Sequence, residues 1–156
     1  MDNEKNEDIL QLVSFRIEEE EFGVDINKVQ EIIKMVEITS IPNSPEFIDG
    51  VVNLRGRIIP VIDLRVRLKF NKKESDNKSR IVVIEVESKT VGFLVDEVSE
   101  VLRVPQSITE KPPKMVAGIE SGFIKAICKL ENRLLILLDM EAILSVEEIS
   151  EIDAVA

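Results

Sequence analysis

Residues 50–64 have the sequence Gly50-Val51-Val52-Asn53-Leu54-Arg55-Gly56-Arg57-Ile58-Ile59-Pro60-Val61-Ile62-Asp63-Leu64. Two apolar runs flank a short polar turn, which is the pattern of a β-hairpin. Gly56 can adopt the positive φ that the turn requires. Pro60 donates no backbone hydrogen bond, so its strand should lie at a sheet edge or carry a bulge at that point. Asp63 should cap a short helix over residues 64–68.

The composition is that of a globular protein rich in β structure. The chain has 156 residues, of which 44% are hydrophobic and 4% aromatic. Valine and isoleucine must therefore fill the core, which favours sheet. No apolar run reaches the roughly 18 residues of a membrane helix, so we expect no direct membrane insertion. The polar residues 1–8 do not resemble a signal peptide, and the single Cys128 fits a reducing cytoplasm.

The negative charge is concentrated near the two ends of the sequence. The formal net charge is −10, to which residues 1–8 contribute −3 and residues 146–156 contribute −4, leaving −3 for residues 9–145. Nucleic-acid binding requires a basic face, so this balance disfavours it. The local group of basic residues between Arg55 and Lys73 should be a solvated or protein-facing patch.

The two halves of the chain resemble one another, which indicates an internal repeat. Residues 47–68 align without gaps on residues 123–144, and six of these 22 positions are identical. The identical pairs are Phe47/Phe123, Ile48/Ile124, Leu54/Leu130, Arg57/Arg133, Asp63/Asp139 and Leu68/Leu144. Gly56 falls on Asn132, and asparagine is the next most tolerant residue for a left-handed turn. Because Asp63 falls on Asp139, both should be helix caps.

The segments before these two hairpins also correspond. Two predicted strands precede each hairpin, at residues 12–17 and 22–26 in the first half and at residues 81–86 and 90–95 in the second. In the segments that follow these strands, Val29 aligns with Val98 and Glu31 with Glu100. The repeat unit therefore includes nearly the whole of each half.

The repeat decides the predicted fold class, which is mainly β with two small β-barrel subdomains and short helices. Closure into barrels removes the exposed edges that so many short strands would otherwise leave. The predicted boundaries are a disordered acidic lead over 1–10, barrels over 11–70 and 80–145, a linker over 71–79, and an acidic helix or tail over 146–156. Residues 81–84 and 93–95 have no polar face, so these strands should be covered on both sides near the junction of the barrels.

The sequence does not have the pattern of an enzyme site. It contains no histidine, which is the commonest general base and a frequent metal ligand. Asp63 and Asp139 occupy equivalent positions of the repeat, which favours helix caps over a catalytic pair. The glycines do not have phosphate-binding spacing. We therefore expect no catalysis, no bound metal and no cofactor.

Several of these segments resemble the signature of the CheW family, the bacterial chemotaxis coupling proteins. The central hairpin is similar to the family's most specific motif, which joins a turn, an arginine and a proline. The resembling segments are residues 50–56 with 60–64, 22–26 with 29–32, 91–96 with Val98, and 133–137. The resemblance extends from residue 11 to about residue 148.

The resemblance implies two SH3-like β-barrels and a bridge between chemoreceptors and the histidine kinase CheA. It also implies a cytoplasmic protein that is recruited to membrane-associated receptor arrays. No receiver domain pattern is present, which disfavours the fused adaptor CheV, and no kinase or phosphotransfer pattern supports a complete CheA. Two alternatives remain open, a regulatory β-barrel module of another kinase scaffold and a small-barrel nucleic-acid-binding protein.

One predicted surface would bind the helical tip of a receptor in an apolar groove between the barrels. The aligned valines suggest the groove, and its expected apolar residues are Val13, Ile26, Val29, Ile32 and Val98. We add Glu31, Asn53 and Arg55 to this surface. Arg55 matches the arginine of the family hairpin, whereas its repeat partner is Glu131. The alternative is that the apolar residues are core positions.

A second predicted surface would bind CheA, whose regulatory domain is implied to resemble this chain. Contact between barrel ends would then be a quasi-symmetric pairing. We place it on the proline-containing loop over 38–45, with a weaker contact near Met115 in the second barrel. The residues are Ile38, Ile41, Pro42, Pro45 and Met115. The alternative is that Ile38 and Ile41 plug their own barrel.

Overall fold

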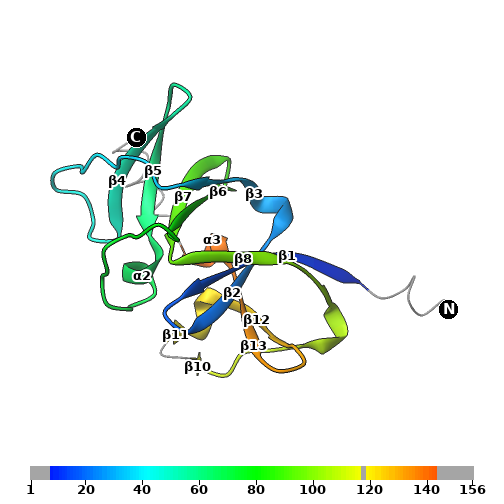
Figure 1. The fold of residues 1–156 in the computed structure, drawn as a ribbon. Coiled ribbons are helices and arrows are strands. Elements are labelled where there is room, and N and C mark those ends of the chain that lie inside the picture. The colour runs from blue at the N-terminus through cyan, green and yellow to red at the C-terminus, as the bar shows by residue number, and fades with distance from the viewer. Residues whose placement is uncertain (1–7, 117–118, 144–156) are drawn as a thin grey trace.

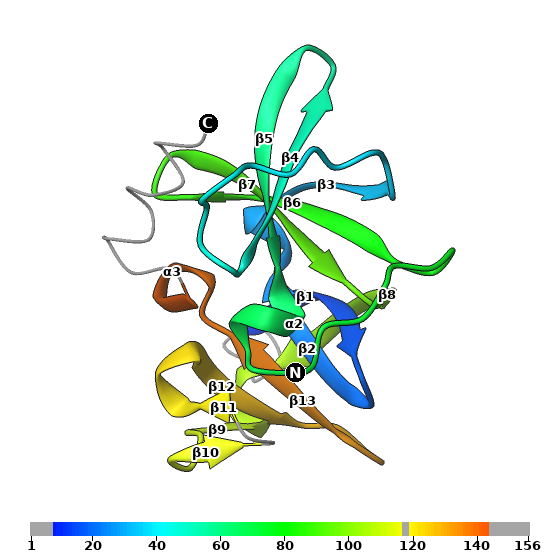
Figure 2. The ribbon, with the colours of Figure 1, turned by 90° about the vertical axis from the view of Figure 1, so that its left-hand side faces the viewer.

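The computed structural model describes residues 8–116 and 119–143, and its strands form two main sheets that each curl into a small SH3-like barrel (Figure 1). Barrel 1 contains, in spatial order, β3 (Val29–Lys34), β6 (Arg80–Val86), β7 (Lys89–Val95), β5 (Arg57–Asp63) and β4 (Ile48–Leu54). Barrel 2 contains β8 (Glu97–Pro105), β1 (Ile9–Ile17), β2 (Glu20–Asp25), β13 (Leu134–Leu138), β12 (Ile124–Lys129) and β9 (Thr109–Glu110). Figure 2 shows barrel 1 above barrel 2.

Short helices and one small ladder connect these strands. They are η1 (Ile26–Lys28), α2 (Leu64–Arg67), η2 (Gln106–Ile108), η3 (Ser121–Phe123) and α3 (Met140–Ile143), with β10 (Met115–Val116) paired to β11 (Ile119–Glu120). Among the described residues, no helix is long and apolar enough to cross a membrane. The acidic tail expected over 146–156 lies outside the described residues.

The strands of the two repeat units are interleaved between the barrels. The hairpin β6–β7 follows the predicted linker over 71–79 yet completes barrel 1, while the hairpin β1–β2 completes barrel 2. In barrel 1, β5 runs parallel to β7 with Val61 opposite Gly92. In barrel 2, β13 runs parallel to β2 with Leu137 opposite Gly23, the equivalent positions of the repeat. The segment 71–79 therefore joins α2 to β6 within barrel 1, and the sequential division predicted there does not describe how the strands pair.

Each barrel is closed by the segment that follows its outer strand. After β3, the Thr39 N–H donates to the Val51 carbonyl of β4 and the Val51 N–H donates to the Thr39 carbonyl, both at 2.9 Å. In barrel 2, β9 pairs with β12 with Glu110 opposite Ile127, the repeat equivalent of Val51. Gly50 permits the closure of barrel 1, because a Cβ there would lie 2.2 Å from the Thr39 carbonyl oxygen.

Three groups of buried side chains fill the fold. The interior of barrel 1 contains Val52, Ile59, Val61, Ile81, Val83 and Leu94, and the interior of barrel 2 contains Leu12, Val104, Cys128, Leu135 and Leu137. The largest group, which we call the shared core, includes Phe15 and Phe22 from barrel 2 and Phe93 from barrel 1. Residues of β6 and β7 contribute both to the interior of barrel 1 and to the shared core. This confirms the prediction that these apolar strands are covered on both faces.

The central hairpin forms as predicted, but its turn is tighter. β4 and β5 are joined by Arg55 and Gly56 alone, with φ of 53° and 85°. Positive φ at both positions matches the twist that a two-residue hairpin turn needs. Contrary to the prediction for Pro60, β5 is an inner strand, and the bulge in its pairing with β4 lies between Ile48 and Gly50 instead of at the proline. Its pairing with β7 begins only at Val61, so the proline lies where β7 forms no ladder with it.

Both predicted aspartate caps form. Asp63 Oδ1 accepts a hydrogen bond from the Arg65 N–H at 3.0 Å where α2 begins, and Asp139 Oδ1 accepts one from the Ala142 N–H at 3.1 Å where α3 begins. Asn132 differs from its repeat partner, because its φ is not positive. The connection from β12 to β13 is longer than that from β4 to β5 and needs no left-handed residue there.

Strands β1 and β8 extend the fold beyond the sequence-based expectation. Ile9 and Leu10, which fall within the expected disordered lead, pair with Pro105 and Val104. The sequence pattern does not reveal β8, because its apolar and charged residues do not alternate. Pairing with β1 along most of its length makes it a strand.

Candidate partner-binding surfaces

The tip of the central hairpin reaches across barrel 1 to β3. Arg55 Nη1 donates to Glu31 Oε1 at 3.2 Å, and Arg55 Nη2 makes a second contact with Glu31 Oε2. The hydrogen bond and the charge of Glu31 raise the pKa of Arg55. A bidentate pair fixes the orientation of the guanidinium, although 70% of the Arg55 side chain is exposed. Barrel 1 therefore presents an exposed cation at a defined place beside β3.

Two other predicted receptor-binding residues lie in the same part of barrel 1. Ile32 is 39% exposed on β3. Asn53 is also exposed, and its Oδ1 accepts a hydrogen bond from the Gly56 N–H at 2.8 Å. Asn53 therefore stabilises the turn that positions Arg55.

Three of the predicted groove residues are half-buried at the junction of the barrels. Ile26, Val29 and Val98 all pack against the shared core. They lie close to the points where the chain passes between barrels, since Ile26 begins η1 and Val98 lies near the start of β8. We call these three residues the junction strip.

Val13 does not belong to this surface, and its place in the predicted groove is corrected here. Only 3% of Val13 is exposed, and it lies within the shared core. The physical reason is the position of β1 between β2 and β8 in the sheet, with apolar groups on both of its faces. Val13 cannot contact a partner in this fold.

The loop over 38–45 divides into a buried part and an accessible part. Ile38 packs against the interior of barrel 1, which is the alternative that the sequence leaves open for it. Ile41 is half-buried and belongs to none of the three buried groups. Its carbonyl accepts a hydrogen bond from Ser44 Oγ at 2.8 Å. Ile41 is therefore the apolar side chain that this loop can offer to a partner.

The other predicted kinase-binding residues lie in two separate places. Pro42 is exposed and Pro45 is half-buried. The Pro45 carbonyl accepts from the Ile48 N–H at 3.0 Å, which fixes the end of the loop to β4. Met115 lies in β10, where it pairs with Glu120, and so belongs to a different part of the fold.

The sequence pattern does not reveal an ion pair that ties the tip of β12–β13 to the hairpin β1–β2. Arg133 Nε donates to Glu21 Oε1 at 2.6 Å, and Glu21, which is 8% exposed, also accepts from Ser14 Oγ at 2.5 Å. The repeat partners of Arg133 and Glu21 are Arg57 and Thr90 in barrel 1. They are also in contact, because Arg57 Nη2 donates to Thr90 Oγ1 at 3.1 Å. An arginine at this repeat position thus ties one hairpin to the next in each barrel.

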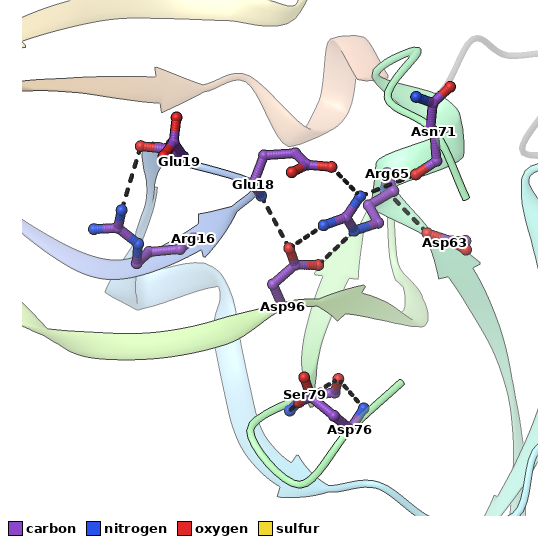
Figure 3. A network of polar contacts seen from close by, with 9 residues as sticks. All are labelled: Arg16, Glu18, Glu19, Asp63, Arg65, Asn71, Asp76, Ser79 and Asp96. Atoms are coloured by element: carbon purple, nitrogen blue, oxygen red, sulfur yellow. Dashed lines mark hydrogen bonds and ion pairs between the residues drawn. The ribbon is translucent and has the colours of Figure 1, made fainter. Parts of the chain in front are cut away.

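A buried arginine, Arg65, lies within the expected basic patch. Only 5% of the Arg65 side chain is exposed, so the prediction of a solvated or protein-facing patch is wrong for this residue. Arg65 Nε donates to Asp96 Oδ1 at 2.7 Å, and its Nη2 contacts the other carboxylate oxygen (Figure 3). Burial acts to raise the pKa of Asp96, but hydrogen bonds from Arg65 and from the Glu18 N–H outweigh it. The pKa of Asp96 therefore lies below its ordinary value.

We expect Asp96 to make part of the folding stability depend on acidity. A carboxyl group whose pKa is lowered by folding stabilises the fold above its unfolded pKa of about 3.9, and this contribution is lost as the pH falls through the folded pKa. The free-energy difference of unfolding between wild type and Asp96→Asn should be constant near neutral pH and should shrink below about pH 4. Urea unfolding at several pH values measures it. A difference that stays constant to about pH 3 contradicts the assignment.

The difference between wild type and Asp96→Asn is needed because another aspartate, Asp63, changes folding stability with pH in the opposite direction. Burial and the charge of Asp49 raise the pKa of Asp63, so Asp63 favours folding as the solution becomes more acidic. Wild type and Asp96→Asn share this contribution, and it cancels from their difference.

The described residues present features of a binding surface. Within residues 8–116 and 119–143, no three His, Cys, Asp or Glu side chains gather where they could hold a metal ion. Burial raises the pKa of the Cys128 thiol to about 11, which makes it unreactive near neutral pH. A fixed surface cation, the junction strip and an accessible isoleucine can instead give a partner charge and apolar contact.

Comparisons with a family model, with curated proteins and with solved structures all match this chain to CheW proteins over most of its length. The family described as CheW-like domain matches residues 11–148. The chemotaxis protein CheW of Klebsiella aerogenes is 39% identical over 142 residues, which cover 91% of this chain and 86% of that protein. The chemotaxis protein CheW of Thermotoga maritima is 38% identical over 143 residues, covering 90% of this chain and 89% of that protein. The crystal structure of the scaffolding protein TtCheW from Thermoanaerobacter tengcongensis matches with a TM-score of 0.82 and 38% identity, over 89% of this chain and 90% of that one.

Proposed function

This chain belongs to the CheW family of chemotaxis proteins, and from that membership we propose that it is a non-catalytic adaptor that couples chemoreceptors to the histidine kinase CheA. An adaptor of this kind must hold two partners at once, so it needs two separate surfaces. It would act in the cytoplasm, at membrane-associated receptor arrays.

The proposal for the receptor is carried by the Arg55–Glu31 pair with Ile32 and the junction strip. A receptor tip is a helical hairpin, and a helix laid on an apolar groove is a recurring mode of recognition. The junction strip would supply the apolar contact, while Arg55 would bind acidic or carbonyl groups of the tip. Because Glu31 already orients the guanidinium, little further ordering of Arg55 is needed on binding.

The kinase surface is proposed on the accessible part of the loop over 38–45. The regulatory domain of CheA would contact this end of barrel 1 with an equivalent end of its own barrel, and such quasi-symmetric contacts can extend into rings. The loop is held at Thr39 and at Pro45 by backbone hydrogen bonds to β4. This anchoring reduces the entropy that Ile41 loses when a partner covers it.

We expect Ile41→Asp to weaken CheA binding at least about tenfold, a loss of roughly 1.4 kcal/mol. The aspartate would place a charge in an apolar contact, where its desolvation is not compensated. Receptor binding should be unchanged, since Ile41 is not part of the junction strip. Titration of each partner by isothermal calorimetry measures both affinities.

Leu134→Asp provides the matched control for this variant. Leu134 is a 57% exposed apolar residue at the start of β13, outside both proposed surfaces. The Leu134→Asp variant should bind CheA as wild type does. If folded Ile41→Asp binds CheA normally, or loses both partners together, the kinase surface proposed here is wrong.

A direct capture experiment tests the function as a whole. Beads carrying a receptor cytoplasmic hairpin and beads carrying CheA should each retain the wild-type chain. Retention by neither partner under conditions where both are folded would overturn the proposal. A salt-sensitive shift of labelled nucleic acid would favour the nucleic-acid-binding alternative instead.

A further inference from the structure

The described chain passes between the two barrels at two crossovers. The first is η1, which leads from β2 of barrel 2 to β3 of barrel 1. The second is Asp96, which separates β7 of barrel 1 from β8 of barrel 2. Any change in the angle between the barrels must therefore bend the backbone at these two places.

The second crossover is held by a group of polar contacts around the buried Arg65 side chain (Figure 3). The Asp96 carboxylate accepts from Arg65 and from the Glu18 N–H at 2.9 Å, and the Asp96 N–H donates to the Arg16 carbonyl at 3.1 Å. Arg65 Nη1 also donates to Glu18 Oε1 at 2.6 Å and to the Asn71 carbonyl at 2.9 Å. One guanidinium from α2 thus contacts the crossover, the β1–β2 turn of barrel 2 and the segment that leaves α2.

A second arginine of α2 also contacts elements that adjoin barrel 2. The Arg67 guanidinium lies 4.7 Å from the ring centre of Phe123 in η3 and 5.5 Å from the ring centre of Phe47. Phe47 and Phe123 are repeat partners. Arg67 Nε donates to the Ile143 carbonyl of α3 at 2.8 Å. Cation–π contact and a hydrogen bond therefore attach the end of α2 to η3 and α3.

The first crossover carries a much weaker counterpart. Lys28 of η1 pairs with Glu141 of α3 at 2.6 Å, and Glu141 is the repeat partner of Arg65. The side chains are 34% and 52% exposed, so solvent screens this pair. The two crossovers thus have ion pairs of opposite polarity, and the pair at Asp96 is the less exposed, with side chains that are 5% and 20% exposed.

We propose that α2 is a clasp in which Arg65 and Arg67 are positioning residues that fix the angle between the barrels. The shared core holds the barrels together, but apolar contact is not directional and permits small rotations. A bidentate ion pair and an oriented cation–π contact impose a defined geometry.

The clasp has a consequence for binding that rests on the proposed function. The junction strip takes Val29 from barrel 1 and Val98 from barrel 2, so its shape depends on the angle between the barrels. Loosening the clasp should weaken receptor binding, while CheA binding at Ile41, within barrel 1, should remain.

The angle can be measured on the full chain without any partner. Nitroxide labels at Lys34→Cys in β3 and Arg103→Cys in β8, both exposed positions, report the distance between the barrels by pulsed electron spin resonance. The native Cys128 is buried and should not label. Arg65→Gln/Asp96→Asn removes the ion pair without leaving a buried charge, and Arg67→Met removes the stacked guanidinium. Both should shift the mean distance and broaden its distribution.

Two controls separate positioning from loss of stability. Ile59→Val weakens the interior of barrel 1, and Lys129→Gln removes the Lys129–Glu110 ion pair within barrel 2. Both should keep the wild-type distance distribution. If Arg65→Gln/Asp96→Asn does not fold, Arg67→Met decides the question.

A wild-type distribution in the folded clasp variants would overturn the proposal and would show that the shared core alone sets the angle. This outcome leaves the adaptor function untouched, because no partner is present in the measurement. Conversely, wild-type protein that binds neither partner would contradict the adaptor function without affecting the clasp.

Discussion

Arg55→Glu should fold normally and should abolish the coupling of receptors to kinase activity. The side chain is mostly exposed, so its replacement should leave the melting temperature within a few degrees of wild type. The new carboxylate would lie beside that of Glu31, and the positive charge of the hairpin tip would be lost. A receptor tip that needs a positive group beside β3 would then be repelled. Thermal unfolding and a reconstituted kinase assay with receptor membranes measure the two effects.

Two further variants show whether Arg55 contacts the partner or acts only through its pair with Glu31. The exchanged pair Glu31→Arg/Arg55→Glu restores the ion pair but moves the positive charge from the hairpin tip to β3. Coupling should remain absent if Arg55 itself contacts the partner. Arg57→Glu, at the start of β5 next to the turn, should retain coupling because Arg57 bonds to Thr90 instead. Normal coupling by Arg55→Glu would rule out the assigned role.

Val29→Glu should lose receptor binding at least about tenfold, a loss of roughly 1.4 kcal/mol, and keep CheA binding. Val29 is half-buried against the shared core, so a glutamate there can turn its carboxylate to solvent and allow folding. The same carboxylate would lie where the receptor helix must make apolar contact. Sedimentation with receptor membranes measures the loss.

Val98→Glu tests the same surface from barrel 2. It should show the same loss, because Val98 completes the junction strip from β8. Leu134→Glu, with an equally large change at an exposed site, should bind receptors normally. If Val29→Glu unfolds, the residue is a core position, and if it folds and binds receptors as wild type does, the junction strip is not the receptor site.

Local features of this fold could be predicted from the sequence because their causes are local. The Arg55-Gly56 turn, the caps Asp63 and Asp139 and the strands around them depend on residues a few positions apart. The repeat also predicted two barrels, because equivalent patterns require equivalent structures. Even here Asn132 differs, since a longer turn removes the need for a left-handed residue.

The pairing of strands could not be predicted in the same way. A β6–β7 hairpin with two apolar faces fits either barrel equally well, and only the complete fold determines which neighbour it joins. For the same reason Val13 has the pattern of a strand with an available face, although the shared core covers that face. The interleaving places the junction strip at two crossovers, which no sequential division of the chain would give.

The polar clusters could not be predicted because their members lie far apart in the sequence. Arg65 lies in a run of basic residues that is typical of a solvated surface, but its acceptors Glu18 and Asp96 are 47 and 31 positions away. Glu21 and Arg133 are separated by 112 positions. Charged side chains can be buried when such partners compensate them, and composition alone does not show where that occurs.

The proposed adaptor function requires this small protein to hold a receptor and CheA on different surfaces at the same time. The most direct measurement is sedimentation of receptor membranes with CheA in the presence of wild type, Val29→Glu or Ile41→Asp. Wild type should carry CheA into the pellet. Ile41→Asp should enter the pellet without CheA, and Val29→Glu should remain in the supernatant bound to CheA. If either folded variant loses both partners together, or if both carry CheA into the pellet as wild type does, the two-surface arrangement is contradicted.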